Sequence, residues 1–269
     1  MLESSKTSCD EVTFCSVSFF SKDYLKLNQE ITGIKNWYII PDDGDYNIPG
    51  FNVLLEDINP ISSDIKDDAL VGKASYRHAF KLNTLTKFCK TRFICYIDPD
   101  FFIFQPITEI LDIMKNNGFH FFGAPYYPDP RRKKVYDFPV GFCMFVDTER
   151  VDVSKLDFTP AGELPDGTMG DTGYHIYKNN LDKPNYAVLP SYPNKLDFAK
   201  TTQKSLLHTG IQPDTRMDEY FYPDGKLFGV HLHAKLHLRQ GIERQVRAAE
   251  HITAIKKLYK RIKTNDKSI

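Results

Sequence analysis

The segment spanning residues 92–106 constrains the fold most, because it joins a buried strand to acidic side chains. Its apolar run Phe93–Ile97 stops at Asp98, and a second apolar run begins directly after Asp100. Removing a carboxylate from water costs several kcal/mol unless it is paired or holds a cation. We therefore expect a core strand that ends in two acids, with a divalent metal as their partner. The alternative is a plain turn, which Asp-Pro-Asp also favours.

The composition is that of an ordinary globular protein. The chain has 269 residues, of which 41% are hydrophobic and 26% charged, enough for one large α/β domain with a substantial core. We expect a single domain over residues 1–240, followed by a basic amphipathic helix and tail over residues 241–269. Lys plus Arg equals Asp plus Glu at 35 each, so no overall field draws the chain to nucleic acid.

The cysteine spacing and the length of the apolar runs indicate the cellular compartment of the protein. Five cysteines without Cys-x-x-Cys spacing are typical of buried free thiols in a reducing compartment. No stretch approaches the roughly 18 to 20 apolar residues of a membrane span, and the polar start over residues 1–11 does not resemble a signal peptide. These observations predict a cytoplasmic protein.

The first part of the chain predicts a strand, a helix and a strand, at Val12–Phe20, Asp23–Ile31 and Trp37–Ile40. Such a unit is usually parallel with a right-handed crossover, and the loop after each strand then lies on the ligand side. An acidic cluster, Asp-Asp-Gly-Asp, follows the second strand and is equally consistent with a solvated turn. The candidates to contact a nucleotide are Ser16, Val17, Ser18, Phe19, Asp42 and Asp43.

An amphipathic helix is predicted just before the acidic segment, because Ala79, Leu82, Leu85 and Cys89 recur at intervals of three or four. Its amino end carries glycine, lysine and other polar residues, and a basic helix start suits a diphosphate. An ordinary solvated basic face is the alternative. The residues at this end are Gly72, Lys73, Ser75, Arg77 and His78.

Two later segments carry further candidates. Asp171 precedes a short helix predicted over Tyr174–Asn179. Asp171 or Thr172 would cap this helix, and Asp171 could instead be a catalytic base or an acceptor ligand. Residues 227–238 alternate in polarity, which predicts a strand with its histidines on one face. Alternate histidines can reach one cation, although solvated or hydrogen-bonded histidines would give the same pattern. These histidines are His231, His233 and His237.

The C-terminal segment predicts a helix over Gly241–Lys263 with a strongly basic end. The basic end is consistent with cations that complement the helix dipole, or with peripheral attachment to an anionic membrane. The residues expected to form the packed apolar stripe are Ile242, Val246, Ala249, Ile252 and either Ile255 or Tyr259.

The order of these features resembles a GT-A fold glycosyltransferase, an enzyme that uses a nucleotide sugar as donor. The most specific part is the block from His78 through Leu82-Asn83 to Tyr96-Ile97-Asp98-Pro99-Asp100 and Phe104-Gln105-Pro106, and the resemblance covers roughly residues 12–238. It implies an α/β, Rossmann-like fold whose mostly parallel central sheet is flanked by helices.

The resemblance also implies roles for the candidate residues. Asp100 would coordinate Mn²⁺ or Mg²⁺, Asp98 would bind the metal, the ribose or the sugar, and His231, with His233 as the alternate, would complete the metal shell. Residues 16–19 and Asp42 or Asp43 would hold the base and ribose, and Arg77 or His78 the phosphates or ribose. Asp171 would be the base in an inverting enzyme, or an acceptor ligand in a retaining one. The donor would be a UDP- or GDP-sugar and the acceptor a hydroxyl of a glycan or lipid-linked glycan.

Two other functions are consistent with the same features. A sugar-1-phosphate nucleotidyltransferase shares the nucleotide-binding layout and metal acids, but it usually carries a glycine-rich basic loop after the first strand, and Val17-Ser-Phe-Phe-Ser21 lacks one. A non-catalytic nucleotide- or sugar-binding module is the other alternative.

Overall fold

The computed structural model describes residues 8–41, 46–54, 74–125, 138–167, 169–180, 185–189, 191–192, 218–232 and 241–264. The chain divides into two compact units, each built from separate segments. Residues 1–17, 34–98 and 107–188 form the first unit, and residues 18–33, 99–106 and 189–269 form the second. Neither unit is a continuous stretch, and the predicted boundary at residue 240 stays a prediction.

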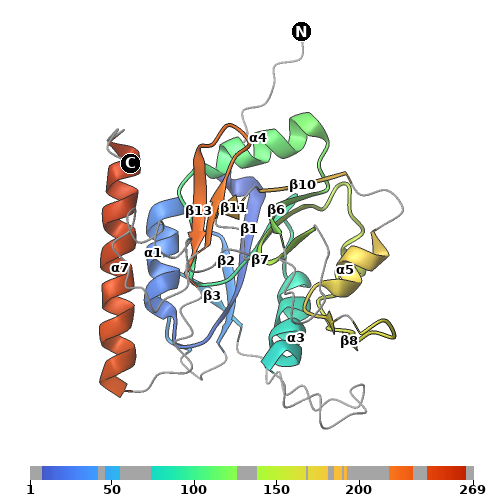
Figure 1. Ribbon diagram of the computed structural model, residues 1–269, viewed down its shortest axis with the longest axis horizontal. Helices are drawn as coiled ribbons and strands as arrows, with labels where there is room; N and C mark the ends of the chain where they lie inside the picture. Colours follow the sequence, from blue (N-terminus) through green and yellow to red (C-terminus); the bar gives the residue numbers. More distant parts are fainter. Residues whose placement is uncertain are drawn as a thin grey trace. The chain divides into compact units, whose positions relative to one another are not determined.

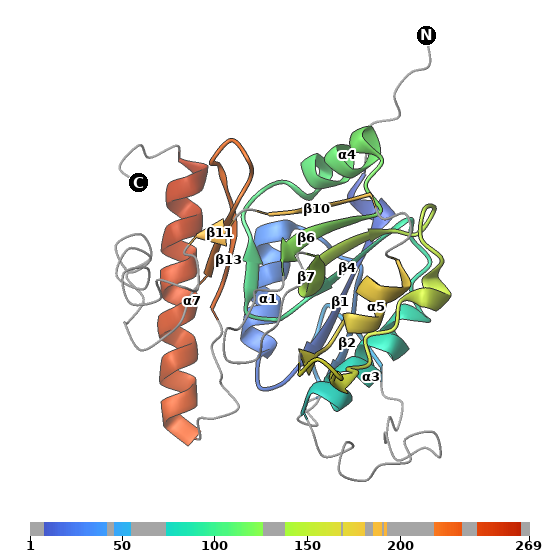
Figure 2. The ribbon, with the colours of Figure 1, turned by 45° about the vertical axis from the view of Figure 1, so that its right-hand side comes forward.

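The first unit is built on a seven-stranded sheet with the order β10-β6-β7-β4-β1-β2-β3 (Figures 1 and 2). Every residue of the strands β1, β4 and β6 is buried, as expected for strands that are covered on both faces. The strands are β1 (Val12–Ser18), β2 (Trp37–Pro41), β3 (Asn52–Val53), β4 (Phe93–Ile97), β6 (Phe121–Pro125), β7 (Pro139–Asp147) and β10 (Tyr186–Val188).

The strand pairings make this sheet mostly parallel. Strands β1 and β4, β2 and β3, and β6 and β10 pair in parallel, whereas β7 runs antiparallel to both β4 and β6. Together with the helices that accompany it, the sheet confirms the predicted α/β fold class with a mostly parallel central sheet.

Within the described residues, the first unit includes the α-helices α3 (Ala74–Thr86), α4 (Ile107–Asn117) and α5 (Tyr174–Asn179). Helix α3 packs into the core of this unit through Ala79, Leu82 and Leu85, as the helical periodicity predicted. A short antiparallel pair, β8 (Gly162–Glu163) and β9 (Met169–Gly170), precedes α5. All five cysteines are free, and Cys15, Cys95 and Cys143 are buried, as predicted.

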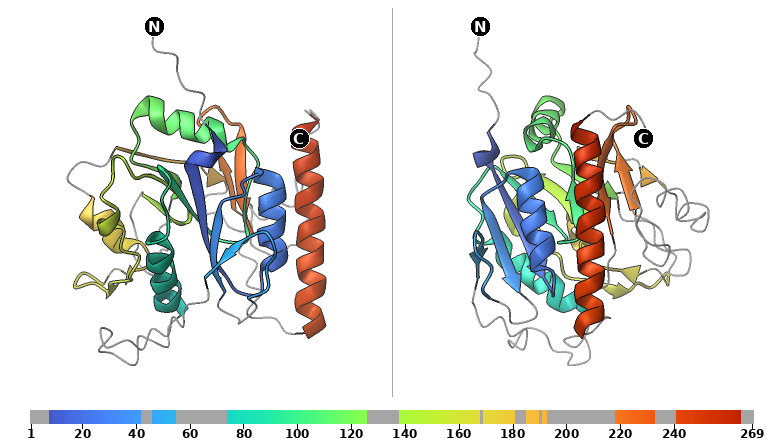
Figure 3. Two further views of the ribbon diagram at one scale, coloured as in Figure 1. Left: turned by 180° about the vertical axis from the view of Figure 1, so that it is seen from behind. Right: turned by 90° about the vertical axis from the view of Figure 1, so that its left-hand side faces the viewer.

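The second unit contains a four-stranded antiparallel sheet with the order β11-β12-β13-β5. Its strands are β11 (Ser191–Tyr192), β12 (Asp218–Phe221), β13 (Leu227–His231) and β5 (Phe101–Ile103). Helices α1 (Lys22–Thr32) and α7 (Gly241–Lys263) belong to the same unit and lie side by side (Figure 3). Residues of α1, α7, β5 and β13 form one apolar core, which includes Tyr24, Leu27, Phe102, Val230, Ala254, Ile255 and Leu258.

The packed face of α7 differs from the predicted stripe. Ile242 and Val246 are 78% and 52% exposed, so that part of the prediction is wrong. Ala249 is exposed as well, whereas Ile255 is buried as predicted, and Ile252 and Tyr259 are partly buried against the same core. The other buried residues of α7 are His251, Ala254 and Leu258. The reason is that the first buried residue of α7 is polar. The buried His251 ring forms a hydrogen bond through Nδ1 with the hydroxyl of Tyr24 on α1, at 2.6 Å.

The predicted strand over residues 227–238 is described only in its first part. Strand β13 covers the start of the predicted segment and ends at His231; residues 233–240, with His233 and His237, lie outside the described residues. Among the helices that the structure describes, none is both long and apolar enough to cross a bilayer.

Candidate metal centre

The Asp-Pro-Asp turn is placed by the strands on either side of it. Strand β4 ends at Ile97, and the Asp98 N–H still donates to the Phe142 carbonyl oxygen at 3.1 Å, so Asp98 continues the ladder to β7. Pro99 has no N–H to donate, and the chain turns before β5 begins at Phe101. The side chains of Asp98 and Asp100 are 27% and 18% exposed. Two carboxylates thus follow a buried strand, as the sequence predicted.

His231 is brought to Asp100 by the pairing of β13 with β5. His231 lies opposite Phe101, and the Leu232 N–H donates to the Asp100 carbonyl oxygen at 3.0 Å. The imidazole Nε2 then lies 3.2 Å from Asp100 Oδ1, and the histidine side chain is only 5% exposed. Gly229 allows this close pairing, since a Cβ there would lie 2.3 Å from the Phe102 carbonyl oxygen.

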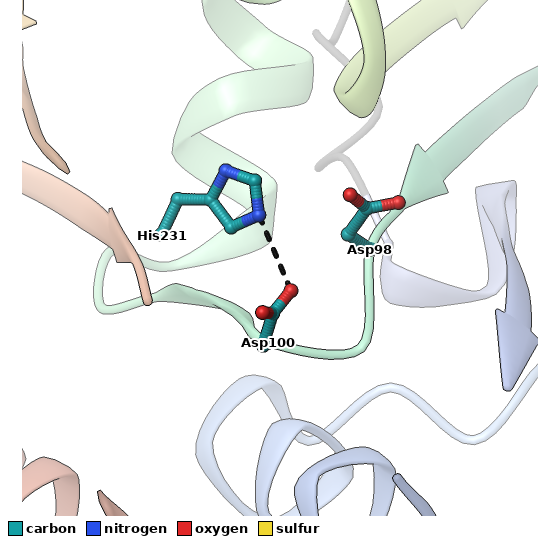
Figure 4. A group of neighbouring side chains, drawn as sticks. All are labelled: Asp98, Asp100 and His231. Carbon is teal, nitrogen blue, oxygen red and sulfur yellow. Dashed lines mark hydrogen bonds and ion pairs between the residues drawn. The ribbon is translucent and has the colours of Figure 1, made fainter. Parts of the chain in front are cut away.

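Asp98, Asp100 and His231 form a group that could hold a metal ion (Figure 4). One ligand atom from each of the three lies within 4.8 Å of the others. Because a single residue separates the two aspartates, the covalent chain alone keeps both carboxylates within reach of one ion. Two carboxylates with one imidazole suit Mn²⁺ better than Mg²⁺, which prefers an all-oxygen shell. The donor set therefore fits the predicted metal.

Two further side chains support the turn. Asn28 on α1 is fully buried, and its Nδ2 donates to the Pro99 carbonyl oxygen at 2.8 Å, which fixes the peptide between the two aspartates. His78 on α3 is half-buried, with Nε2 at 3.7 Å from Asp98 Oδ1. His78 was predicted from the sequence, but Asn28 was not, because an asparagine inside a helix does not reveal its hydrogen-bond partner.

The predicted nucleotide contacts at the end of β1 are mostly buried. The Ser16 hydroxyl donates to the Ile97 carbonyl oxygen at 2.7 Å, and Val17 and Ser18 are buried as well. Phe19 is half-buried, and its N–H donates to the Ser21 hydroxyl oxygen at 3.1 Å. Arg77 is exposed on α3, whereas Asp42 and Asp43 lie outside the described residues. The nucleotide-binding role of all these residues stays a prediction.

Phe20, the residue after Phe19, has a conformation that the sequence did not predict. Its φ is 53°, in the left-handed region that non-glycine residues rarely adopt. The ring is 41% exposed, and the Arg244 guanidinium carbon of α7 lies 3.6 Å from its centroid. This cation–π contact joins the turn after β1 to the first turns of α7.

Asp171 lies in the turn before α5 and is half-buried. Its Oδ1 accepts from the Thr172 N–H at 2.9 Å, and the residue that caps α5 is Gly173, with φ 85° and no side-chain hydrogen bond. The prediction that Asp171 or Thr172 caps this helix is therefore wrong, because a left-handed glycine takes the capping position. The catalytic or acceptor role of Asp171 stays a prediction.

Asp218 is a further acidic residue near the candidate metal centre, and it was not predicted from the sequence. It begins β12, and it is 3% exposed. In the register of β12 and β13 it stands directly opposite His231. The sequence feature that could have indicated this residue is the adjacent acidic pair Asp218 and Glu219, which is separated by a short turn from the strand-like segment that carries His231.

Comparison with known proteins adds solved structures only. No protein-family profile matches the chain, and neither does any curated protein. TarS 1–349 of S. aureus in complex with UDP-GlcNAc matches at 10% identity and TM-score 0.40, over 73% of this chain and 65% of that one. The mannosyltransferase PcManGT from Pyrobaculum calidifontis, in complex with GDP-Man and Mn²⁺, matches at 10% identity and TM-score 0.37, over 74% and 63%.

A third structure, A197 from STIV, matches at 12% identity and TM-score 0.36, over 81% of this chain and 93% of that one. The chain spans about half to two thirds of the TarS structures that it matches. Similarity at this level does not assign the chain to the family of any of these proteins. The function is therefore argued from the site itself.

Proposed function

We propose that the protein is a metal-dependent glycosyltransferase that moves a sugar from a nucleotide diphosphate sugar to a hydroxyl acceptor. The observation that carries the proposal is the contact of His231 with Asp100, two residues 131 positions apart in the sequence. A nearly buried imidazole beside a carboxylate, with a second carboxylate two residues before it, is an economical way to hold a divalent cation between protein and phosphate oxygens.

The metal ligands in this proposal are Asp98, Asp100 and His231, with Mn²⁺ favoured over Mg²⁺. A bound divalent cation would neutralise charge on the leaving diphosphate as the glycosidic bond breaks. His78, beside Asp98, and Arg77, one residue earlier on α3, would then bind the phosphates or ribose. Residues 16–19, at the end of β1, and Asp42 or Asp43 would hold the base and ribose of a UDP- or GDP-sugar.

Asp171 is proposed as the group that handles the acceptor. In an inverting enzyme its carboxylate would take the proton from the attacking hydroxyl, and in a retaining enzyme it would bind the acceptor by hydrogen bonds. The supporting observation is that Asp171 is half-buried in the turn before α5, with its Oδ1 accepting from the Thr172 N–H. The proposed acceptor is a glycan or a lipid-linked glycan.

The test is a turnover assay with a panel of UDP- and GDP-sugars, each with Mn²⁺ or with EDTA. We expect at least one donor to release its nucleoside diphosphate only when Mn²⁺ is present, and Asp100→Asn to abolish that release. The matched control is Asp224→Asn, which changes an exposed aspartate in the turn between β12 and β13 and should retain activity.

The competing functions are distinguished by this assay together with a second one that supplies a nucleoside triphosphate and a sugar 1-phosphate. Release of pyrophosphate from a nucleoside triphosphate and a sugar 1-phosphate would identify a nucleotidyltransferase. Metal-dependent binding of a nucleotide sugar without any turnover would identify a binding module. If Asp100→Asn and Asp224→Asn turn over every donor as the wild type does, the assignment of the metal site is wrong.

We also propose that α7 contacts an anionic membrane surface from the cytoplasm. The supporting observation is its exposed side: Ile242 and Val246 project from the first turns, and basic residues follow in the last turns, among them Lys260, Arg261 and Lys263. Such a helix binds by partial insertion of apolar groups and by attraction to acidic lipids. Co-sedimentation with vesicles containing phosphatidylserine, compared with neutral vesicles, tests this contact; equal recovery with both would contradict it.

A further inference from the structure

Helix α1 carries a side-chain amide on its otherwise apolar packed face. This amide belongs to Asn28, which is fully buried. The other buried residues of the helix are Tyr24, Leu25, Leu27 and Ile31. A buried amide costs free energy unless its polar atoms are hydrogen-bonded, whereas an apolar side chain of similar size does not. The packing of α1 alone therefore does not explain an asparagine at this position.

The hydrogen bond of Asn28 identifies what the amide does. Its Nδ2 donates to the Pro99 carbonyl oxygen at 2.8 Å. A carbonyl oxygen can only accept, so this bond fixes which end of the amide faces the turn. Asn28 Oδ1 is buried and has no hydrogen-bond partner among the residues that the structure describes. The asparagine thus buries one polar atom without compensation, and in return it holds the Pro99 carbonyl group.

The Pro99 carbonyl belongs to the peptide plane that leads into Asp100. In the next peptide plane, the Asp100 carbonyl oxygen accepts from the Leu232 N–H at 3.0 Å. The planes on both sides of the Asp100 α-carbon are therefore held, one by a side chain of α1 and one by the residue that follows β13. Because peptide units are planar and rigid, holding both planes also sets the direction in which the Asp100 side chain leaves the backbone.

Helix α1 is a firm support for this hydrogen bond. Tyr24 and Leu27 belong to the same apolar core as Phe102 on β5, and the ring centroids of Tyr24 and Phe102 are 5.9 Å apart. The helix is therefore packed against the strand that begins directly after Asp100. A donor on this helix keeps its place relative to the turn without further contacts.

We propose that Asn28 is a positioning residue for the candidate metal centre. It holds the Pro99–Asp100 peptide so that the Asp100 carboxylate stays beside His231, 3.2 Å from Nε2, where both can bind one divalent cation. Asn28 is not one of the three residues that could ligate the ion, so it acts through Asp100. The inference rests on the metal site of the proposed function and does not depend on sugar transfer.

The test compares two substitutions on α1 by calorimetric titration of the full chain with Mn²⁺, without a sugar donor. Asn28→Leu keeps the size of the side chain and removes the donor to Pro99. Residues that orient metal ligands typically contribute 10- to 100-fold to affinity, so Asn28→Leu should weaken Mn²⁺ binding by roughly that factor. The control is Leu27→Ala, which opens a cavity in the core and retains the bond to Pro99. It should keep the Mn²⁺ affinity within about twofold of the wild type.

Thermal melting of the same proteins in EDTA separates positioning from a general loss of structure. Leu27→Ala should lower the melting temperature more than Asn28→Leu does, because the leucine side chain fills the same space and removes the uncompensated amide oxygen. The less stable variant should thus be the one that binds Mn²⁺ more tightly, whereas a merely structural role of Asn28 would give one ranking in both measurements. If Asn28→Leu has no cooperative transition, Asn28→Ala takes its place beside the same control.

Three results would overturn the proposal. Wild-type Mn²⁺ affinity in Asn28→Leu would remove the positioning role and leave the metal site standing. Equal losses of affinity in Asn28→Leu and Leu27→Ala would assign the effect to the packing of α1 and not to this amide. Absence of Mn²⁺ binding by the wild type would overturn the metal site and the positioning role together.

Discussion

Glu219 is a buried carboxylate whose ionisation should make the stability of the protein depend on pH. It lies opposite Val230 in the β12–β13 pair, and Val230 in turn lies opposite Phe102. Both of these residues belong to the apolar core that includes α1 and α7. Glu219 is 3% exposed, and its burial raises the pKa of the carboxyl group from 4.5 to about 7, because desolvation disfavours the charged form.

The sign and size of the effect follow from this shift. The folded chain holds the Glu219 proton more tightly than the unfolded chain, so the free energy of unfolding falls as the pH rises from about 4.5 to about 7. The difference, 7 − 4.5 = 2.5 pKa units, corresponds to about 3 kcal/mol at about 1.4 kcal/mol per unit. The penalty is fully present above pH 7 and is absent below pH 4.5.

Urea unfolding of the wild type and Glu219→Gln, in EDTA at pH 5 and pH 8, measures this penalty. Glutamine has a similar shape and no charge, so the variant should be more stable than the wild type at pH 8, by up to about 3 kcal/mol. At pH 5 the difference should shrink to less than about 1 kcal/mol. Glu163→Gln, which changes an exposed glutamate on β8, should show no such pH dependence.

The result that would refute this reasoning is a stability difference between the wild type and Glu219→Gln that is the same at both pH values. Such a result would mean that the folded protein supplies the ionised Glu219 with compensating interactions as favourable as water. The pKa of the carboxyl group would then not be raised in the folded state.

Two other substitutions test one residue in each of the two large sheets. Asp147 is fully buried, and its Oδ2 forms ion pairs with Arg92 Nη2 at 2.9 Å and with Arg150 Nε at 3.2 Å. Asp147→Asn should therefore lower the free energy of unfolding by about 3–5 kcal/mol in urea titrations, while the Mn²⁺ affinity stays unchanged. It pairs with Phe93, at the opposite end of β4 from Asp98, and a large loss of Mn²⁺ affinity in this variant would contradict that separation. Gly229→Ala should lower both stability and Mn²⁺ affinity, because its Cβ would press on the Phe102 carbonyl and shift the strand that carries His231. An Mn²⁺ titration identical to that of the wild type would show that strands β5 and β13 accommodate the added methyl group without loss of affinity.

The elements that the sequence predicted well are those whose apolar pattern is undisturbed. Strand β4 is a continuous apolar run, β1 is rich in β-branched and aromatic residues, and α3 repeats apolar residues at helical spacing. For the same reason the metal centre could be anticipated: two acids that interrupt a core strand, and a histidine in an alternating segment, are visible exceptions to their surroundings. The structure places the His231 imidazole beside the Asp100 carboxylate, and the role of both residues as metal ligands stays a prediction.

The features that escaped prediction carry polar residues on buried faces or depend on backbone conformation. Strand β12 buries Asp218 and Glu219 on opposite faces, so it shows no alternation of polarity. The packed stripe of α7 begins with a histidine whose partner, Tyr24, is 227 residues away. The left-handed conformations of Phe20 and Gly173 set the turns before α1 and α5, and no side-chain pattern encodes them.

The interleaving of the two units has a consequence for how the chain is made in the cell. Strand β5 and helix α1 belong to a unit whose other elements, β13 and α7, come about 120 residues or more later in the sequence. At a synthesis rate of roughly 5–20 residues per second, the apolar segment Phe101–Phe104 would wait on the order of 6 to 25 seconds for its partner strand to emerge. During that interval an unpaired aromatic strand is exposed on the ribosome, which makes this short segment the natural place for a chaperone to bind the nascent chain.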